Sequence, residues 1–375
     1  MQRQPGLDLL RAIAIVWVMV FHSYYAGGYS GGGIWRWSGW MGVDLFFALS
    51  GFLIGSQVLK PLARGEPFSF ADFYLRRAFR ILPVYLLVLA IYVGWPFLRE
   101  APGMRPTWEF LTFSMNLWPA PSSQVALSHA WSLCVEEHFY LLFPMFAVAL
   151  AWRPSPRRVV ATCMVLMLGG MLLRGMLWTT EVAPLQAAGR AAGQAYMRYL
   201  YMPTWARLDD LLGGVVLAGI RCYRPQLWSW LQARAWALLI VGLGLVGLCM
   251  VWFAGQRLAF AQNVFGYPLL ALGMMALVCG AASPHSIVGR RRVPGATWLA
   301  LASYSLYLTH KAVYANVHRW LGARVEGHGW WTVLVYAVAV LLVGAVFHYG
   351  VERPFLRLRS RVRHARTRGL LGETG

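Results

Sequence analysis

Long apolar runs alternate with short polar connections along the whole chain. Each run is close to the length of about 20 residues that an α-helix needs to cross a bilayer. This pattern predicts an all-α fold, a polytopic transmembrane helix bundle of about ten spans. The expected spans are 7–27, 39–59, 81–98, 133–152, 157–178, 205–220, 235–254, 263–283, 297–318 and 330–350. We expect residues 1–350 to form a transmembrane domain and residues 351–375 to form a basic cytoplasmic tail too short to fold alone.

The composition agrees with a membrane protein. Hydrophobic residues make up 58% of the 375 residues and charged residues 13%, and the mean hydropathy is +0.51. A soluble globule of this length needs more polar surface. No small-residue cleavage site follows the first apolar run, so we expect that run to remain as a span and not to be removed as a signal peptide.

The formal net charge of +20 would suggest nucleic acid as the partner of a soluble protein. In a membrane protein, the distribution of the basic residues predicts the topology instead. With the N-terminus inside, 22 of the 34 basic residues fall on the cytoplasmic side and 8 on the other. We therefore expect a multi-pass protein of the inner cell membrane with both termini cytoplasmic, surrounded by lipid and without a nucleic-acid partner. The basic tail is typical of a segment lying on anionic lipid, although a partner site or a funnel for CoA phosphates remains open.

The five cysteines have no CxxC spacing and lie in or beside apolar stretches. They indicate neither a disulfide framework nor a metal site, and we expect them to be small packing residues.

Two ionisable residues, Arg11 and His22, interrupt the first apolar run. Eleven helical steps of about 100° return to within about 20° of the starting direction, so the two residues share one face about 16 Å apart. An ionisable residue inside a membrane span is a functional hypothesis by default. Polar neighbours in the bundle could satisfy one such residue, but two on one stripe favour a function.

Further polar residues lie at the outer ends of the second and fourth predicted spans. Asp44 lies near the outer end of the second span, and the Ser50-Gly51 pair lies mid-helix, where small residues allow close packing. Glu136 and Glu137 open the fourth span. Because adjacent helical residues point to different faces, we expect at most one of the two acids to face the same cavity as His22.

Arg76, Arg77 and Arg80 lie at the cytoplasmic mouth of the third predicted span. Arg76 and Arg80 are about one helical turn apart, a spacing that suits a phosphate-rich ligand. Anchoring of the positive-inside type explains these arginines equally well.

The sixth and ninth predicted spans also hold polar groups. Arg207 begins the sixth span with Asp209 and Asp210, and the i,i+3 spacing of Arg207 and Asp210 permits an internal ion pair. The ninth span is rich in hydroxyl groups, including Tyr304, and holds His310, for which a satisfied bundle histidine is the favoured interpretation. A bundle with this polar interior fits a transporter as well as a transmembrane transferase.

An ordered set of short motifs resembles the acyltransferase 3 family of integral membrane O-acyltransferases, and the resemblance covers nearly the whole chain. The motifs are Arg11-x10-His22, Phe46-Phe47-x-x-Ser50-Gly51, Arg76-Arg77-x-x-Arg80-Ile81-x-Pro83, Trp131-Ser132-Leu133-x-x-Glu136-Glu137-x-Phe139-Tyr140, Arg207-x-Asp209, Ser303-Tyr304-Ser305-Leu306-Tyr307 and Glu352-x-Pro354. Cys134 and His138 depart from the form usual in the fourth motif, where a hydroxyl residue and a glutamine are expected. We expect these two departures to change local hydrogen bonding but not the resemblance to the family.

The resemblance implies transfer of an acetyl or other short acyl group from acyl-CoA, with acetyl-CoA as the expected co-substrate, to a hydroxyl of a cell-envelope or exported glycan. No bound cofactor and no metal are implied, and the chain resembles a stand-alone form without a fused hydrolase-like domain. The implied catalytic residues are His22, Arg11, Glu136 and Glu137. The implied donor-binding residues are Arg76, Arg77, Arg80 and Ser50, and the supporting polar core is Asp44, Arg207, Asp209, Tyr304 and His310.

The implied chemistry suits a histidine. A neutral imidazole can accept the proton of a sugar hydroxyl as its oxygen attacks a thioester carbonyl, and a water-poor cavity limits hydrolysis. Two alternatives remain at the level of the sequence. One is a transporter or exporter that uses the buried polar residues for proton relay or substrate binding, and the other is a non-catalytic partner of a glycan-assembly complex.

Overall fold

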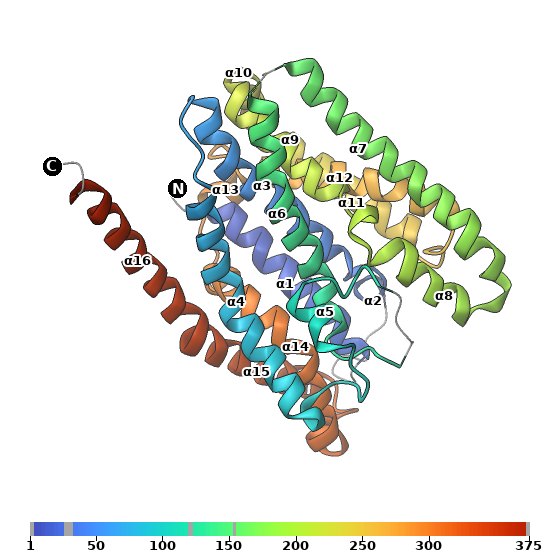
Figure 1. Cartoon of the computed structure of the whole chain (residues 1–375). Coiled ribbons are helices and arrows are strands. Elements are labelled where there is room, and N and C mark those ends of the chain that lie inside the picture. The colour runs from blue at the N-terminus through green and yellow to red at the C-terminus, as the bar shows by residue number, and fades with distance from the viewer. Residues whose placement is uncertain (1–3, 26–32, 119–122, 153–154, 373–375) are drawn as a thin grey trace. The chain divides into compact units, whose positions relative to one another are not determined.

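A computed structural model describes residues 4–25, 33–118, 123–152 and 155–372, so the last three residues of the predicted tail lie outside the described part. The long regular elements of the described residues are all helices, which confirms the predicted all-α membrane bundle (Figure 1). The α-helices are α1 (Pro5–Tyr25), α2 (Ile34–Ser38), α3 (Met41–Ala63), α4 (Phe70–Gly94), α5 (Thr107–Leu111), α6 (Trp131–Ala151), α7 (Pro156–Leu177), α8 (Arg190–Tyr196), α9 (Asp209–Tyr223), α10 (Pro225–Ala233), α11 (Ala235–Phe253), α12 (Tyr267–Ala281), α13 (Ile287–Arg290), α14 (Ala296–Val325), α15 (Trp330–Phe347) and α16 (Arg353–Gly372).

Within the described residues, eight helical segments are long and apolar enough to cross a membrane: Pro5–Tyr25, Met41–Ala63, Phe70–Gly94, Ser128–Ala151, Arg157–Ala188, Ala235–Phe253, Gln262–Ala281 and Trp330–Val362. Two other expected spans are helical but differ from these. At 205–220 the chain forms a short 3-10 turn, η6 (Thr204–Ala206), and then α9, whose 15 residues reach about 22 Å. At 297–318 it forms α14, which has 30 residues but carries the hydroxyl-rich polar stretch.

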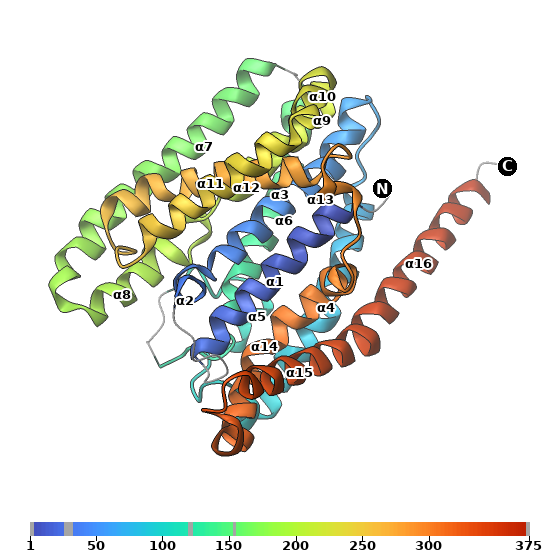
Figure 2. The same ribbon diagram turned by 180° about the vertical axis from the view of Figure 1, so that it is seen from behind.

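The contacts divide the chain into two compact units, of which the first holds residues 1–22, 31–68 and 103–300. Its centre is α3, and 78% of the most apolar part of that span is buried, against 6% for the span Arg157–Ala188. Helices α3 and α9 pack side by side, as do α11 and α12 (Figures 1 and 2). Glycines permit the α3–α9 approach: a Cβ atom on Gly51 would lie 2.1 Å from the Leu211 carbonyl oxygen, and one on Gly214 would lie 2.3 Å from that of Ala48.

The second unit holds residues 23–30, 69–102 and 301–375. It contains α4, most of α14, α15, α16 and the π-helical turn η8 (His348–Glu352). An ion pair between Lys311 and Glu100 (3.3 Å) and a hydrogen bond from Asn316 to the Leu98 carbonyl (2.8 Å) fasten α14 to the segment that follows α4. Most of the predicted basic tail is helical: its residues 353–372 form α16, which follows η8 directly.

Candidate functional site

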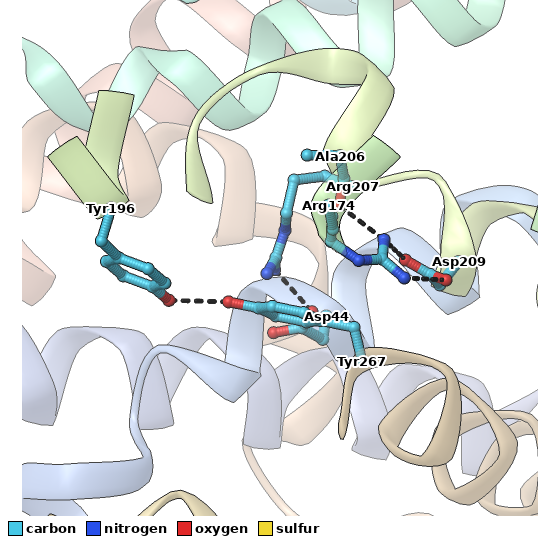
Figure 3. Close-up of polar contacts among 7 residues, drawn as sticks. All are labelled: Asp44, Arg174, Tyr196, Ala206, Arg207, Asp209 and Tyr267. Carbon is cyan, nitrogen blue, oxygen red and sulfur yellow. Dashed lines mark hydrogen bonds and ion pairs between the residues drawn. The ribbon is translucent and has the colours of Figure 1, made fainter. Parts of the chain in front are cut away.

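A buried ion pair lies at the start of α3 in the first unit. Arg207 Nη2 donates to Asp44 Oδ1 at 2.6 Å, and the two side chains are 1% and 0% exposed (Figure 3). The predicted Arg207–Asp210 spacing does not produce this ion pair, since Arg207 precedes α9 and has a backbone outside the helical region (φ −130°, ψ 26°). The ion-pair partner of Arg207 is therefore Asp44 of α3 and not Asp210 of α9.

A second buried ion pair fixes the first residue of α9. Arg174, near the end of α7, contacts both carboxylate oxygens of Asp209 at 2.6 and 3.0 Å and also donates to the Ala206 carbonyl at 3.0 Å (Figure 3). Such a forked guanidinium–carboxylate contact fixes orientation as well as charge. The segment from η6 to α9 is thus held by α3 on one side and α7 on the other.

Aromatic rings surround the Arg207 guanidinium. Its Cζ atom lies 4.4 Å from the ring centre of Tyr267 and 4.8 Å from that of Tyr201, distances typical of cation–π contacts. The Tyr267 and Tyr196 hydroxyls are 2.7 Å apart (Figure 3). Arg257 Nε donates to the Tyr196 hydroxyl at 3.0 Å. Aromatic rings and the Asp44 carboxylate therefore enclose the Arg207 guanidinium.

A smaller cluster joins α3 to α6. The Ser50 hydroxyl donates to Glu136 Oε1 at 2.5 Å, and the Tyr140 hydroxyl donates to Glu136 Oε2 at 3.0 Å. The Tyr140 and Ser50 oxygens are themselves 3.2 Å apart. A carboxylate that accepts from two hydroxyls is fixed in orientation.

The two polar residues of α1 are both half-buried. His22 Nδ1 lies 3.1 Å from the Val18 carbonyl oxygen. Because a carbonyl only accepts, Nδ1 carries a proton, and a neutral ring then has its lone pair on Nε2. Arg11 lies three turns earlier on α1.

The second unit contains a cluster around Glu352. Its Oε1 atom is ion-paired with Arg80 of α4, and its Oε2 atom accepts from the Ser305 hydroxyl at 2.7 Å and contacts His348 Nδ1 at 3.0 Å. Glu352 is 1% exposed, whereas the Arg80 side chain is 21% exposed.

The other predicted residues of this unit lie nearby on α4 and α14. Arg76 forms an ion pair with Asp72 one turn earlier, and Arg77 is half-buried. The Tyr304 hydroxyl donates to the Ile81 carbonyl at 2.9 Å. His310 is fully buried, its Nδ1 lies 2.7 Å from the Tyr307 carbonyl, and the surroundings fit the satisfied bundle histidine that the sequence favours.

The structure thus joins Ser50 to Glu136, Asp44 to Arg207, and Arg80 to a residue outside the predicted site. Residues that the site prediction missed are Tyr140, Arg174, Tyr196, Tyr201, Arg257, Tyr267, Ser305, His348 and Glu352. Tyr140, Ser305 and Glu352 belong to motifs visible in the sequence, and Arg174 is an arginine within a span. His348 belongs to none of the sequence motifs named above. No group of three or more potential metal ligands occurs among the residues that the structure describes.

Comparison with known proteins identifies the family. The family model described as an acyltransferase domain, Acyl_transf_3, matches residues 4–349. The chain is 27% identical to YrhL of Bacillus subtilis (strain 168), provisionally named a peptidoglycan O-acetyltransferase, with 93% of this chain and 54% of the relative covered. It is 23% identical to the peptidoglycan O-acetyltransferase OatA of Listeria monocytogenes (strain EGD-e), with 93% and 55% covered.

A third relative, the O-acetyltransferase OatA of Staphylococcus aureus (strain NCTC 8325), is 25% identical, with 90% of this chain and 54% of that protein covered. The chain therefore spans about half the length of these curated relatives. No solved structure matches it. The match over residues 4–349 establishes that the chain belongs to the acyltransferase 3 family of membrane acyl-transferring enzymes.

Proposed function

We propose that this chain is a membrane O-acyltransferase that transfers an acetyl or other short acyl group from acyl-CoA, most simply acetyl-CoA, to a hydroxyl of a cell-envelope glycan. The match to the acyltransferase family over residues 4–349 carries the proposal. The names of the relatives support acetyl as the group and a glycan such as peptidoglycan as the acceptor.

His22 is the general base of the proposed reaction. Its Nε2 atom takes the proton of the acceptor hydroxyl while the hydroxyl oxygen bonds to the thioester carbonyl carbon. The tetrahedral intermediate then collapses, the carbon–sulfur bond breaks, and the imidazolium returns its proton to the CoA thiolate. The hydrogen bond to the Val18 carbonyl supports this role, because it keeps the first proton on Nδ1.

Glu136 is the acid that we assign to the site in preference to Glu137. The Ser50 and Tyr140 hydroxyls fix its carboxylate, and a fixed negative charge stabilises a transient imidazolium. Ser50 acts in this proposal through Glu136.

The donor's phosphates bind at the arginines of α4, Arg76, Arg77 and Arg80. Guanidinium groups form forked hydrogen bonds to phosphate and stay charged at all relevant pH values. Arg11 positions the donor. Both termini are cytoplasmic in this proposal, and acyl-CoA enters from the same side.

The donor site is tested with the double variant Arg76→Ala/Arg80→Ala. Binding of acetyl-CoA to the purified protein is measured by isothermal titration calorimetry, and loss of two charge-assisted contacts is expected to weaken it at least about tenfold. The matched control is Arg157→Ala/Arg158→Ala, which removes two exposed arginines of α7 and is expected to bind as the wild type does. Unchanged binding by the first variant would refute the donor site.

A further inference from the structure

The buried carboxylate Glu352 connects the donor arginines to α14 and η8. We propose that Glu352 is a positioning residue: held by Ser305 and His348, it fixes the Arg80 guanidinium in the orientation that binds a phosphate of the acyl-CoA donor. The inference rests on the proposed function, because it assigns a role to Arg80 at that same site.

The contacts of Glu352 leave its carboxylate no freedom to turn. Oε2 accepts from Ser305 and faces His348 Nδ1, which must carry a proton because a carboxylate only accepts. Oε1 faces Arg80. Oε2 therefore binds Ser305 and His348, and Oε1 binds Arg80.

The backbone explains why Glu352 and His348 share a side. Pro354 has no N–H, so the α-helical hydrogen-bond pattern cannot continue through it, and the chain forms the π-helical turn η8 between α15 and α16. Residues four apart in η8 meet, and this brings His348 Nδ1 to 3.0 Å from Glu352.

Arg80 remains suited to a second anion. Its ion pair with Glu352 is made through Nη1, a guanidinium has five N–H donors, and the side chain is 21% exposed. Displacement of Glu352 by phosphate would leave a buried unpaired charge, which is strongly unfavourable. Arg80 therefore bridges Glu352 and the donor, and holding its flexible side chain in advance lowers the entropy cost of binding.

A double-mutant cycle on the full chain in membranes tests this role. The KM for acetyl-CoA and kcat are measured for the wild type, Glu352→Ala, Arg80→Ala and the double variant. We expect Glu352→Ala to raise KM about tenfold with a smaller change in kcat, and to add nothing in the Arg80→Ala background. Glu352→Gln keeps an oxygen acceptor for Arg80 and is expected to restore part of the affinity. The control Glu66→Ala removes an acid from an exposed ion pair with Arg64 and should leave KM unchanged.

If Glu352→Ala does not fold, Ser305→Ala tests the same positioning role. This variant removes one hydrogen bond to Glu352 and keeps the ion pair with Arg80. It is expected to raise KM less than Arg80→Ala does and to have no effect in that background. If Arg80→Ala raises KM while the Glu352 or Ser305 change does not, or if their effects add to that of Arg80→Ala, the positioning role is wrong and the donor site stands. If Arg80→Ala itself leaves KM unchanged, the donor site of the proposed function is wrong too.

Discussion

Arg207 and Asp44 show how much a single buried charge depends on its partner. Both side chains are almost fully buried, and the guanidinium also contacts the rings of Tyr201 and Tyr267. Breaking a buried ion pair typically costs about 3–5 kcal/mol, because the remaining charge has lost both water and partner.

We expect Arg207→Ala to lower the free energy of unfolding by about 3–5 kcal/mol, measured as a fall in thermal stability in detergent. The double replacement Arg207→Met/Asp44→Leu should recover part of this loss, since it removes both charges of the ion pair together. Arg198→Ala, at an exposed arginine of the same region, should change stability little. An Arg207→Ala protein that unfolds at the wild-type temperature would contradict this interpretation.

Glu136 and Glu137 are adjacent in the sequence but should differ in function. Glutamine at 136 removes the negative charge and replaces one of the two acceptor oxygens, to which Ser50 and Tyr140 donate, with an NH2 donor. We expect Glu136→Gln to reduce acceptor-dependent CoA release about 100-fold or more, and Glu137→Gln to reduce it only a few-fold. Equal effects of the two changes would remove the basis for choosing between the acids.

Packing of α3 against α9 depends on glycine at the contact. A Cβ on Gly51 would overlap the Leu211 carbonyl oxygen, and a backbone atom cannot move aside without separating the helices. We expect Gly51→Ala to destabilise the protein by about 1–3 kcal/mol.

The matched change is Gly244→Ala in α11, where nothing lies within 4 Å of the new methyl group. It should be neutral or slightly stabilising, because alanine favours a helix over glycine by up to about 1 kcal/mol. Thermal unfolding of the two variants compares the two positions directly. A Gly51→Ala protein as stable as the Gly244→Ala protein would show that the helices do not approach as described.

The predictability of the elements depends on how far apart the interacting residues lie in the chain. Apolar run length predicts the spans, and the small Ser50-Gly51 pair predicts close packing, because both are local properties. Helix α9 begins at Asp209 and not at the predicted residue 205, because residues 204–206 form a 3-10 turn and Arg207 has a non-helical backbone. Ion pairs between residues far apart in the chain, such as Asp44 with Arg207 or Glu352 with Arg80, leave no periodic pattern in the sequence. They are visible only in the structure.

At the scale of the whole molecule, the charge distribution predicts a definite topology. Because 22 basic residues fall on one predicted side and 8 on the other, both ends of this chain should lie in the cytoplasm. Epitope tags at the two ends should both be inaccessible to antibody in spheroplasts and both become accessible after permeabilisation. Detection of one tag without permeabilisation would contradict the topology and with it the entry of acyl-CoA from that side.

Acyl transfer by His22 is the central claim, and it is tested most directly by comparing His22→Ala with the wild type at matched membrane expression. CoA release from acetyl-CoA and O-acetyl content of the surface glycans are measured together, with His318→Ala at an exposed histidine as the control. We expect His22→Ala to lose both activities by about 100-fold or more while His318→Ala retains them. Retention of both activities by a correctly inserted His22→Ala protein would contradict the catalytic role of His22 and favour a transporter or a non-catalytic partner instead.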